Sequence, residues 1–340
     1  MKIITVQDVA QIVKTHGFNN FMQDLIKYLK EDFSNWNDFD KSPRSGIRTD
    51  DGVIELMPIA SKEFFSYKYV NGHPKNPTIG KPTIFATGQL SQIADGEPVI
   101  FAEMTTLTGF RTAATSALAS EFLARKNSSV LAIIGNGAQS EFQAIAQSLV
   151  RNIKTIKYFD IDTNAMNKFH NNLKHRIDAQ FVACTSAQEA VDGADVIVVC
   201  TARNAHVNVV LNDWVKPGAH INSLGSDTPG KTELELKILF QSKVVIEFMP
   251  QSMVEGEIQR LSKEELNNRV YAELWEIVSN KKPGRSNDTE ITIFDAVGFA
   301  IEDYSTLRLV YDLANKYKLG HDLDMVPVLK DPKNLIAAFD

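Results

Sequence analysis

The sequence predicts an α/β protein with a doubly wound parallel sheet and a separate strand-rich region ahead of it. Strand-like apolar runs alternate with helical stretches from residue 130 to residue 297, the pattern of a parallel sheet covered by helices. Residues 52–104 instead hold short strand-like runs with no helix between them, so this part is not a βαβ array. The 340 residues are enough for two domains with hydrophobic cores.

The first region begins with a helix and continues as strands. Residues 20–36 carry apolar side chains on one helical stripe, which predicts a packed helix. A basic, turn-rich segment follows, and short strands are expected at 52–59, 67–70, 83–90 and 98–104. The last two flank Ala94, Asp95 and Gly96, a turn sequence that predicts a hairpin.

An alanine-rich helix at 108–124 is expected to connect this region to the alternating part of the chain. A long helix at 299–318 is expected to cross back, so that both chain ends build the first region. Between these helices, parallel strands are predicted at 130–134, 156–161, 180–185, 195–201, 220–224, 243–248 and 291–297.

The turn after residues 130–134 has the features of a dinucleotide-binding βαβ unit, although an ordinary strand-to-helix turn is the alternative. Gly135 allows a sharp turn, and Gly137 lacks a Cβ, so N–H groups at the positive helix end can approach a pyrophosphate. Asp160 ends the next strand, where its carboxylate can accept hydrogen bonds from both adenosine ribose hydroxyls. A 2′-phosphate would meet this charge, which favours NAD over NADP. Ser140 replaces the usual glycine or alanine and suggests a wider helix-to-strand approach.

Composition and charge argue against several classes of protein. The sequence is 44% hydrophobic and 23% charged, and its net charge of -6 argues against a nucleic-acid partner. Seven histidines and two cysteines show no metal-ligand spacing, so no metal is expected. Cys184 and Cys200 lie in apolar runs and are interpreted as buried thiols, which fits a reducing cytosol. No signal peptide and no run of transmembrane length is found, so a cytoplasmic protein with no membrane partner is expected.

Motifs are spread along nearly the full chain: Lys41-Ser42-Pro43-Arg44, GVIELMP at 52–58, YKYVNGHP at 67–74, FRTAATS at 110–116, IGNGAQSEFQA at 134–144, GSDTPGKTE at 225–233 and FDAVGFAIED at 294–303. Together and in this order they resemble the ornithine cyclodeaminase/μ-crystallin family, and specifically its bacterial ornithine cyclodeaminases. The resemblance implies a Rossmann-type NAD-binding domain at 116–314. It also implies an α+β substrate-binding and dimerisation domain made from 1–115 and 315–340, and a homodimer.

By this resemblance Arg44, Lys68 and Arg111 hold the α-carboxylate of an amino-acid substrate. Arginine offers a planar fork that binds a carboxylate with two hydrogen bonds. Each residue also has a plainer interpretation: Arg44 as an exposed loop arginine, Lys68 as a solvent-facing strand residue, and Arg111 as a residue opening a helix. Alternation places Lys68 on the strand face opposite Tyr67 and Tyr69.

Two carboxylates are the remaining candidates for chemistry, and with Lys68 they form the predicted catalytic set. Glu55 lies in the apolar run GVIELMP. It is either a residue on the solvent face of an edge strand or the counter-ion of a substrate δ-amino group. Asp227 lies among turn residues, yet it follows the strand at 220–224 and so lies at the carboxyl edge of the sheet, where ligands bind. The resemblance makes Asp227 the general acid and base.

The remaining contacts are implied by the family alone, apart from Ala138 and Gln139, whose amides lie at a predicted helix N-terminus. Val297 is implied to touch substrate. Ser226 stands where the family often has a second glycine, and Ala296 replaces an expected serine, so no hydroxyl contact is available there. The full expected set of cofactor contacts is Thr83, Arg111, Gly135, Gly137, Ala138, Gln139, Asp160, Thr201, Asn222, Asp227, Lys231 and Ala296.

The resemblance implies an ammonia lyase that converts L-ornithine to L-proline and ammonia with NAD as a catalytic cofactor, in proline biosynthesis and arginine catabolism. Hydride passes from Cα to NAD, the neutral δ-amine attacks the imine carbon, ammonia leaves, and hydride returns to the cyclic imine. Two other functions stay open. One is an NAD(P)-dependent amino-acid dehydrogenase or ketimine reductase, which would show net NADH turnover. The other is a μ-crystallin-like binding protein, against which Asp160 and the charged candidate residues count.

Overall fold

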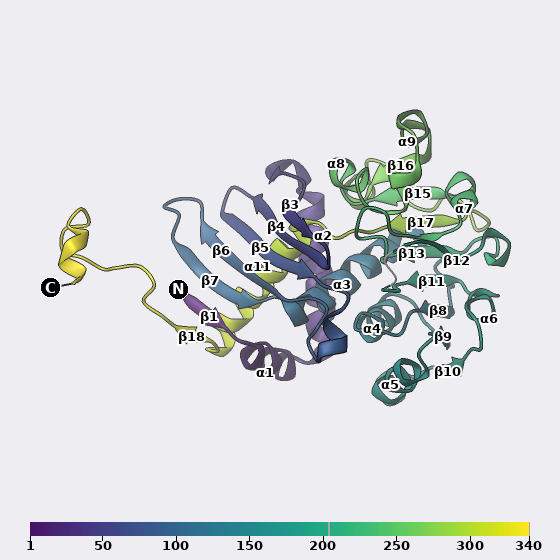
Figure 1. Cartoon of the computed structure of the whole chain (residues 1–340), viewed down its shortest axis with the longest axis horizontal. Helices are drawn as coiled ribbons and strands as arrows, with labels where there is room; N and C mark the ends of the chain where they lie inside the picture. Colours follow the sequence, from purple (N-terminus) through teal and green to yellow (C-terminus); the bar gives the residue numbers. More distant parts are fainter. Residues whose placement is uncertain (203–204, 340) are drawn as a thin grey trace.

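The computed structural model describes residues 1–202 and 205–339, which form two large sheets joined by helices (Figure 1). The first sheet has the order β18-β1-β7-β6-β5-β4-β2, and β3 also pairs with β4. From β2 to β7 neighbouring strands are antiparallel, and β1 joins β7 in parallel. The strands are β1 (Lys2–Ile4), β2 (Asp40–Lys41), β3 (Ser45–Thr49), β4 (Gly52–Ala60), β5 (Phe64–Gly72), β6 (Ala86–Gln92), β7 (Pro98–Glu103) and β18 (His321–Asp322).

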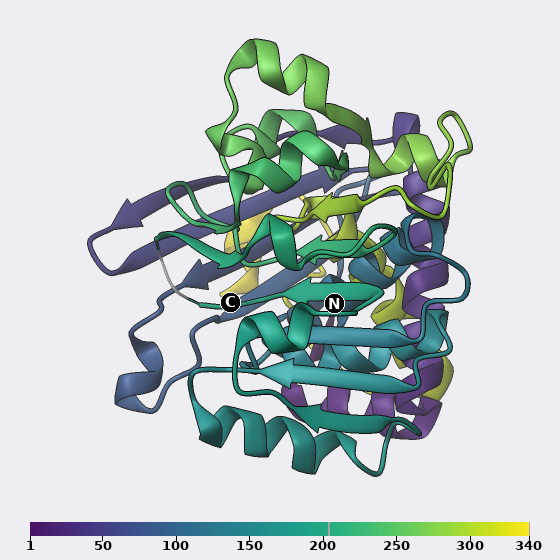
Figure 2. The same cartoon turned by 90° about the vertical axis from the view of Figure 1, so that its right-hand side faces the viewer.

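The second sheet has the order β10-β9-β8-β11-β13-β17-β15-β16, and all of its neighbours are parallel (Figure 2). The chain order reverses between β8 and β11, so the predicted doubly wound sheet is confirmed, with its switch point at the glycine turn. The strands are β8 (Val130–Ile134), β9 (Thr155–Phe159), β10 (Gln180–Ala183), β11 (Val196–Val199), β13 (His220–Ser223), β15 (Lys243–Ile246), β16 (Val270–Glu273) and β17 (Thr292–Asp295). A small parallel pair, β12 (His206–Val210) and β14 (Thr232–Leu234), lies beside it.

Three helices join the two sheets. Helix α11 (Ala300–Tyr317) packs on β4, β5 and β6 and on α2 (Phe18–Ser34), while α3 (Thr105–Leu123) contacts α2, α4 and the strands β6, β13 and β17. Nearly every turn of α3 is buried, and its small residues permit this: a Cβ on Gly109 would lie 2.8 Å from the ring of Phe142. Because α11 packs on strands of the first sheet, the predicted return of the long C-terminal helix to the first region is confirmed.

The other helices are short or lie on the outside. A capping box between Thr5 and Asp8 begins α1 (Val6–His16), and another between Ser262 and Glu265 begins α9 (Lys263–Arg269). No helix in the described ranges combines the length and apolar character that crossing a membrane requires. The remaining helices are α4 (Ser140–Val150), α5 (Thr163–Leu173), α6 (Ala187–Val191), α7 (Leu236–Gln241), α8 (Met249–Ser252) and α10 (Leu274–Val278), with 3-10 turns η1 (Trp36–Asp38), η2 (Asn76–Ile79), η3 (Asn212–Trp214), η4 (Glu257–Arg260) and η5 (Leu335–Ala338).

Strand alternation decides which side chains of the first sheet face α11. Along β4 and β5 the inward residues Glu55, Met57 and Lys68 are buried, whereas Leu56 and Tyr69 are exposed on the opposite face. The predicted orientation of Lys68 away from Tyr67 and Tyr69 is thus correct. The face that it shares with Glu55 is the interior one.

Some expected bounds differ from the observed ones. Strand β6 begins at Ala86 and not at residue 83, and the Phe85 amide just before it donates to the side chain of Asn71 instead of to a backbone carbonyl. The boundary expected at residue 315 falls inside α11, whose contacts with β4, β5 and β6 place residues 300–317 with the first sheet. Residue 340, the end of the expected first domain, lies outside the described residues.

Candidate active site

A cavity of about 530 Å³ lies between the carboxyl ends of the parallel strands and the inner face of the first sheet. Its size falls within the usual range for small-molecule sites. Both sheets contribute: β4 and β5 provide Glu55 and Lys68, α3 provides Arg111, and the loops after β8, β11, β13 and β17 close the other side. Thirteen predicted residues line it: Arg44, Glu55, Lys68, Thr83, Arg111, Gly137, Ala138, Gln139, Thr201, Asp227, Lys231, Ala296 and Val297.

The glycine turn has the geometry of a nucleotide site. Gly135 has a φ of 92°, and a Cβ there would lie 2.8 Å from the carbonyl oxygen of Cys200, so only glycine fits without strain. Gly137 lines the cavity and a Cβ on it would meet no atom within 4 Å, so the space that it leaves is open toward the cavity. The side-chain oxygen of Gln139 and both polar atoms of Asn136 are buried without a hydrogen-bond partner in the described part of the chain. These unpartnered groups suit a polar ligand.

Asp160 is fixed beside this turn rather than in the lining of the cavity. Its Oδ2 accepts a hydrogen bond from the Asn136 amide at 2.5 Å, and its Oδ1 accepts one from the Asp162 amide at 2.9 Å. A carboxylate has about four lone-pair sites, so two remain for further donors. Gly135 likewise shapes the turn without lining the cavity.

Three cations, Arg44, Lys68 and Arg111, form one side of the cavity, called here the cationic wall. The guanidinium of Arg44 is already engaged: Nη2 donates to the carbonyls of Val297 and Gly298 at 2.5 Å each, and Nη1 donates to Glu55 at 3.1 Å. Its Nε lies 3.5 Å from Glu255. The expected two-bond grip of Arg44 on a carboxylate does not fit this geometry, because a single N–H of Nη1 stays uncommitted.

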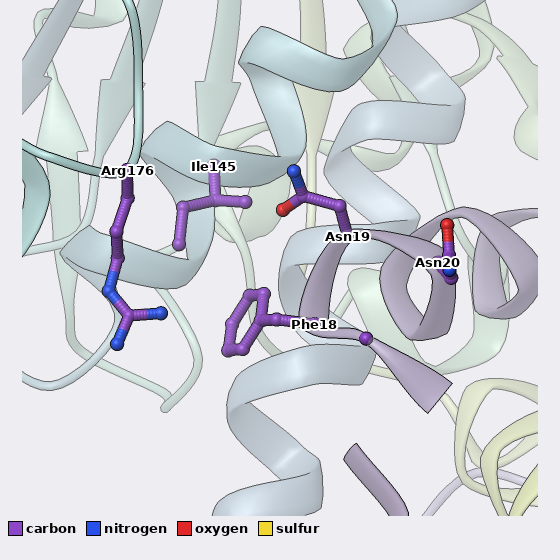
Figure 3. A pocket seen from close by; sticks show the side chains of 6 residues that line it. Phe18, Asn19, Asn20, Ile145 and Arg176 are labelled. Carbon is purple, nitrogen blue, oxygen red and sulfur yellow. The ribbon is translucent and has the colours of Figure 1, made fainter. Parts of the chain in front are cut away.

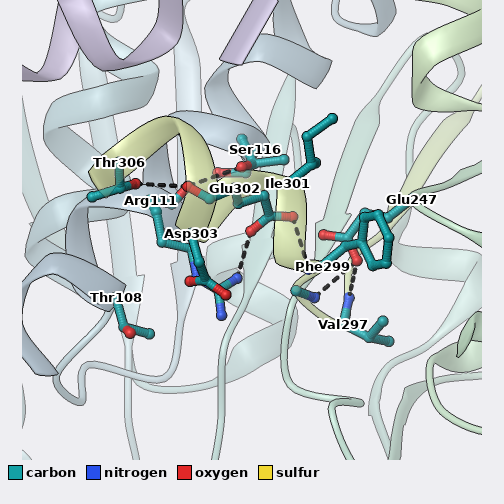
Figure 4. A network of polar contacts seen from close by, with 12 residues as sticks. Thr108, Arg111, Ser116, Glu247, Val297, Phe299, Ile301, Glu302, Asp303 and Thr306 are labelled. Carbon is teal, nitrogen blue, oxygen red and sulfur yellow. Dashed lines mark hydrogen bonds and ion pairs between the residues drawn. The ribbon is translucent and has the colours of Figure 1, made fainter. Parts of the chain in front are cut away.

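Lys68 and Arg111 share a carboxylate from α11 (Figure 4 shows the surroundings of Arg111). Lys68 Nζ donates to Asp303 Oδ1 at 2.8 Å, and Arg111 Nε lies 3.3 Å from the same oxygen. Arg111 Nη1 also donates to Glu302, and within the described residues Nη2 has no protein hydrogen bond. Burial and the charge of Arg111 lower the pKa of Lys68 to about 8, although Asp303 opposes the shift. Burial alone would lower the pKa of Arg111, yet Glu302 and Asp303 outweigh it and raise this pKa.

Arg111 was expected to open its helix, and the structure corrects this. Helix α3 begins at Thr105, because the Glu103 side chain accepts hydrogen bonds from the Thr105 and Thr106 amides at 3.0 and 3.1 Å. Arg111 therefore lies in the second turn and is 6% exposed. Glu55 was weighed as the solvent face of an edge strand, but β4 has partners on both sides and Glu55 is 8% exposed. The exposed-residue interpretations of Lys68 and Arg44 are also wrong.

Asp227 lines the same cavity as the cationic wall, on the loop after β13. Its side chain is 48% exposed, and Oδ1 accepts a hydrogen bond from Lys231 Nζ at 3.1 Å. Burial opposes the charge of Lys231, but Asp227 and Glu233 raise its pKa above the ordinary value. The Thr201 amide donates to Glu233 at 2.9 Å, which ties the end of β11 to β14. Thus Asp227 is a partly solvated carboxylate of the cavity, held in place by a cation.

Asn222, like Gly135 and Asp160, is an expected contact that does not line the cavity. It is fully buried in β13, where its Nδ2 donates to Ser120 of α3 at 3.1 Å. Several residues around the cavity were not singled out from the sequence, among them Glu247, Gln251, Glu255, Gly298, Glu302 and Asp303. Glu302 and Asp303 fall inside the motif FDAVGFAIED, and their position in the first turn of the expected helix, where acidic residues are favoured, was the available signal.

A second hollow of about 360 Å³ lies at the start of α2, where Phe18, Asn19 and Asn20 face Ile145 and Arg176 (Figure 3). None of the predicted site residues lines it. In the described ranges no three His, Cys, Asp or Glu side chains form a group that could hold a metal ion. The candidate active site is therefore the larger cavity, which the predicted residues line.

A glycine turn at the switch point of a parallel sheet, opposite a wall of cations, defines a Rossmann-type enzyme that acts on a small anionic or zwitterionic substrate. Comparison with known proteins makes this more specific. The chain belongs to the ornithine cyclodeaminase/mu-crystallin family, whose sequence pattern matches residues 5–318. The resemblance inferred from the motifs is confirmed.

Relatives with known names agree with this family. The chain is 44% identical to the ornithine cyclodeaminase of Agrobacterium fabrum over 332 residues, which cover 98% of this chain and 92% of the relative. It superimposes with a TM-score of 0.92 on a lysine cyclodeaminase described as recognising L-lysine, L-ornithine and L-2,4-diaminobutyric acid, at 28% identity and 99% coverage of both chains. An archaeal alanine dehydrogenase dimer with bound NAD gives a TM-score of 0.88 at 31% identity, with 96% of this chain and 99% of that one covered.

Proposed function

We propose that the protein is an ornithine cyclodeaminase, which converts L-ornithine to L-proline and ammonia with NAD as a catalytic cofactor. The observation that carries the proposal is that Asp227, Lys68 and Arg111 line one cavity together with Gly137 of the glycine turn. The 44% identity to a bacterial ornithine cyclodeaminase over 98% of the chain supports the same activity. Structural relatives solved with NAD or with NADH and L-proline support the cofactor and the product.

The residues present fit NAD. The open space at Gly137 and the cavity-lining residues Ala138 and Gln139 suit a pyrophosphate at the start of α4. Asp160 keeps free lone pairs for ribose hydroxyls and carries a negative charge that disfavours NADP. Thr83, Thr201, Lys231 and Ala296 lie in the same cavity lining and are proposed as further contacts. Bound NAD supplies the acceptance and the return of the substrate hydride.

Lys68 and Arg111 bind the α-carboxylate of ornithine. Arg111 Nη2 offers two N–H groups that no described residue uses, and Lys68 supplies a charge 2.8 Å from Asp303 that is fixed before substrate arrives. Arg44 adds one N–H and mainly holds Glu55 and the loop at Val297 in place. This assignment gives Arg111, rather than Arg44, the main hydrogen bonds to the α-carboxylate.

Asp227 exchanges protons with the α-amino group of the substrate, and Glu55 binds the δ-amino group. Asp227 takes a proton from the α-amino group before oxidation and returns it to the leaving ammonia, because a half-exposed carboxylate can exchange protons with water. Glu55 Oε2, which accepts from Arg44, orients the δ-nitrogen toward the imine carbon. Enclosure of both groups in one cavity favours ring closure by proximity.

The experiment is incubation of the protein with L-ornithine and substoichiometric NAD. Proline and ammonia should form in equal amounts over many turnovers per NAD, with no accumulation of NADH, because the hydride is borrowed and returned. Accumulation of NADH in proportion to product would identify an amino-acid dehydrogenase. Reaction with lysine or alanine but not ornithine would refute the substrate assignment.

We further propose a homodimer formed through the outer face of the first sheet. Leu56 and Tyr69 are cross-strand partners on that face, 46% and 38% exposed, and Ile47 beside them is 71% exposed. The segment after β18 extends away from the rest of the chain and carries the exposed Phe339 (Figure 1). The alanine dehydrogenase relative is a dimer. Light scattering should give a dimer mass for the native chain and a monomer mass for Leu56→Glu; a monomeric native chain would refute the assembly.

The cellular setting follows from the same proposal. A cyclodeaminase that consumes ornithine would serve proline biosynthesis and arginine catabolism in the cytoplasm. Both cysteines are free, and burial raises the pKa of the Cys184 thiol above its ordinary value, so it stays unreactive in a reducing compartment. Localisation of a tagged chain by cell fractionation tests the compartment.

A further inference from the structure

The turn at residues 297–298 is held by a buried carboxyl group from another strand. Glu247 directly follows β15 and is 1% exposed. Its Oε2 accepts hydrogen bonds from the Val297 and Gly298 amides, both at 2.8 Å. Figure 4 shows Glu247 beside this turn, with Glu302 between it and Arg111.

This turn sets the position of two members of the cationic wall. Its carbonyls, from Val297 and Gly298, accept both hydrogen bonds of Arg44 Nη2 at 2.5 Å. Gly298 has a φ of 81° and packs on Arg111, where a Cβ would lie 2.3 Å from Nη1 and 2.7 Å from Nη2. A displacement of the turn therefore moves Arg44 and Arg111 together.

The buried charges balance only if Glu247 is neutral. Arg111 pairs with Glu302, and Lys68 pairs with Asp303, so each of these cations already has a carboxylate. The carboxyl group of Glu247 lies beside that of Glu302, and among the described residues no ion pair contains Glu247 (Figure 4). Two carboxylates in contact in a dry interior cannot both ionise, so one of them keeps a proton. Burial and the negative charge of Glu302 raise the pKa of Glu247 well above its ordinary value.

We propose that Glu247 is a positioning residue, kept as a neutral carboxylic acid, that donates a hydrogen bond to Glu302 and anchors the 297–298 turn between Arg44 and Arg111. Oε2 accepts from the two amides, and the proton lies on the oxygen that faces Glu302. Glu302 accepts hydrogen bonds from Arg111 and the Phe299 amide, and it is the acceptor for this proton. The effect on substrate binding rests on the proposed function, whereas the protonation state does not.

The first test is spectroscopic and needs no substrate. A protonated carboxylic acid has an infrared carbonyl band that ionised carboxylates lack. The difference spectrum between the native protein and Glu247→Gln at neutral pH should contain this band. The control, Glu264→Gln, removes an exposed carboxylate of α9 and should not. Absence of the band from the Glu247→Gln difference would overturn the proposal, whatever the protein acts on.

The second test separates the effect of the hydrogen bonds of Glu247 from the effect of its size. Glutamine can accept from both amides and donate to Glu302, so Glu247→Gln should keep the KM for ornithine within about threefold of native. Glu247→Met is similar in length but releases the amides, and should raise this KM by about tenfold or more (about 1.4 kcal/mol) with a smaller change in kcat and unchanged NAD affinity. If Gln is as damaging as Met, Glu247 acts as an anion and the proposal fails. A native protein inactive on ornithine refutes the proposed function and leaves the infrared result standing.

Discussion

Replacing Lys68 by methionine tests whether the cationic wall is held by buried ion pairs. Lys68 and Asp303 are both fully buried, with Nζ and Oδ1 2.8 Å apart. Although burial and Arg111 lower the pKa of Lys68 to about 8, the lysine is charged at pH 7 and the pair is intact. Methionine fills the space of the lysine stem and removes the charge. Asp303 is then left with Arg111 Nε at 3.3 Å and an Oδ2 that already has no partner.

Removing one partner of a buried ion pair costs ~3–5 kcal/mol, because the other charge stays buried without compensation. Arg111 remains beside Asp303, so we expect the low end, about 3 kcal/mol of the free energy of unfolding. Changing Asp303 to asparagine as well removes the stranded charge, and the double variant should recover ~1 kcal/mol or more through the coupling of the two sites. Lys62→Met is the matched control, because Lys62 pairs with Asp38 at 2.6 Å but is 82% exposed, and an exposed pair contributes ~0–1 kcal/mol.

The assay is urea unfolding at pH 7 followed by tryptophan fluorescence. Trp36 follows α2 and Trp275 lies in α10, and their rings stack with centroids 6.0 Å apart. Trp36 also contacts Phe299 at the start of α11, so tryptophan emission reports on packing next to that helix. A loss below ~1 kcal/mol for Lys68→Met, equal to that of Lys62→Met, would refute the reasoning. A double variant less stable than Lys68→Met would also contradict it, since no stranded charge would remain.

Three further changes give separate readouts. Asp227→Asn should abolish turnover while NAD affinity stays within about threefold of native. Its free energy of unfolding should change by no more than ~0.5 kcal/mol, because the side chain is half exposed. Normal activity of this variant in steady-state kinetics would refute the role of Asp227. Asp160→Ser should lower the affinity for NAD by about tenfold and allow NADP to bind, as measured by calorimetric titration. A variant that still does not bind NADP would contradict the charge argument. Burial and Arg285 lower the pKa of His220 to about 3. The unfolded chain, with an ordinary histidine pKa of about 6.5, therefore binds the proton first, and stability falls by ~1.4 kcal/mol per pH unit below 6.5. Urea titrations at pH 7.5 and 5.5 should show this loss in the native protein and not in His220→Gln, and equal slopes would refute it.

The glycine turn could be predicted because its determinants are local. Gly135 and Gly137 follow a strand directly, and Asp160 ends the next one, so a short stretch of sequence contains the strand, turn, helix and acid. The orientation of Lys68 relative to Tyr67 and Tyr69 also follows from two-residue alternation. These predictions depend on spacing and need no knowledge of what packs on the strand.

What the sequence could not predict is the burial and the partners of the site residues, which depend on segments far apart in the chain. Lys68 and Glu55 are interior because α11, more than two hundred residues later, covers their sheet face. Arg111 is buried because the Glu103 side chain starts its helix early and Glu302 pairs with it. Asn222 bonds to Ser120 across the helix-to-sheet contact and so never reaches the cavity. No periodicity in the sequence encodes these partners.

The distribution of charge around the cavity explains how a cationic amino acid is accommodated. Ornithine carries one carboxylate and two amino groups, so three unbalanced cations in the wall would repel it as much as bind it. Each cation has instead a buried carboxylate behind it: Arg44 has Glu55 and Glu255, Lys68 has Asp303, and Arg111 has Glu302. These pairs hold the N–H groups in fixed positions while bringing the local net charge close to zero. In the proposed assignment, recognition of the α-carboxylate then depends on the directed N–H groups of Arg111 and Lys68, and Asp227 supplies a negative charge for the amino groups.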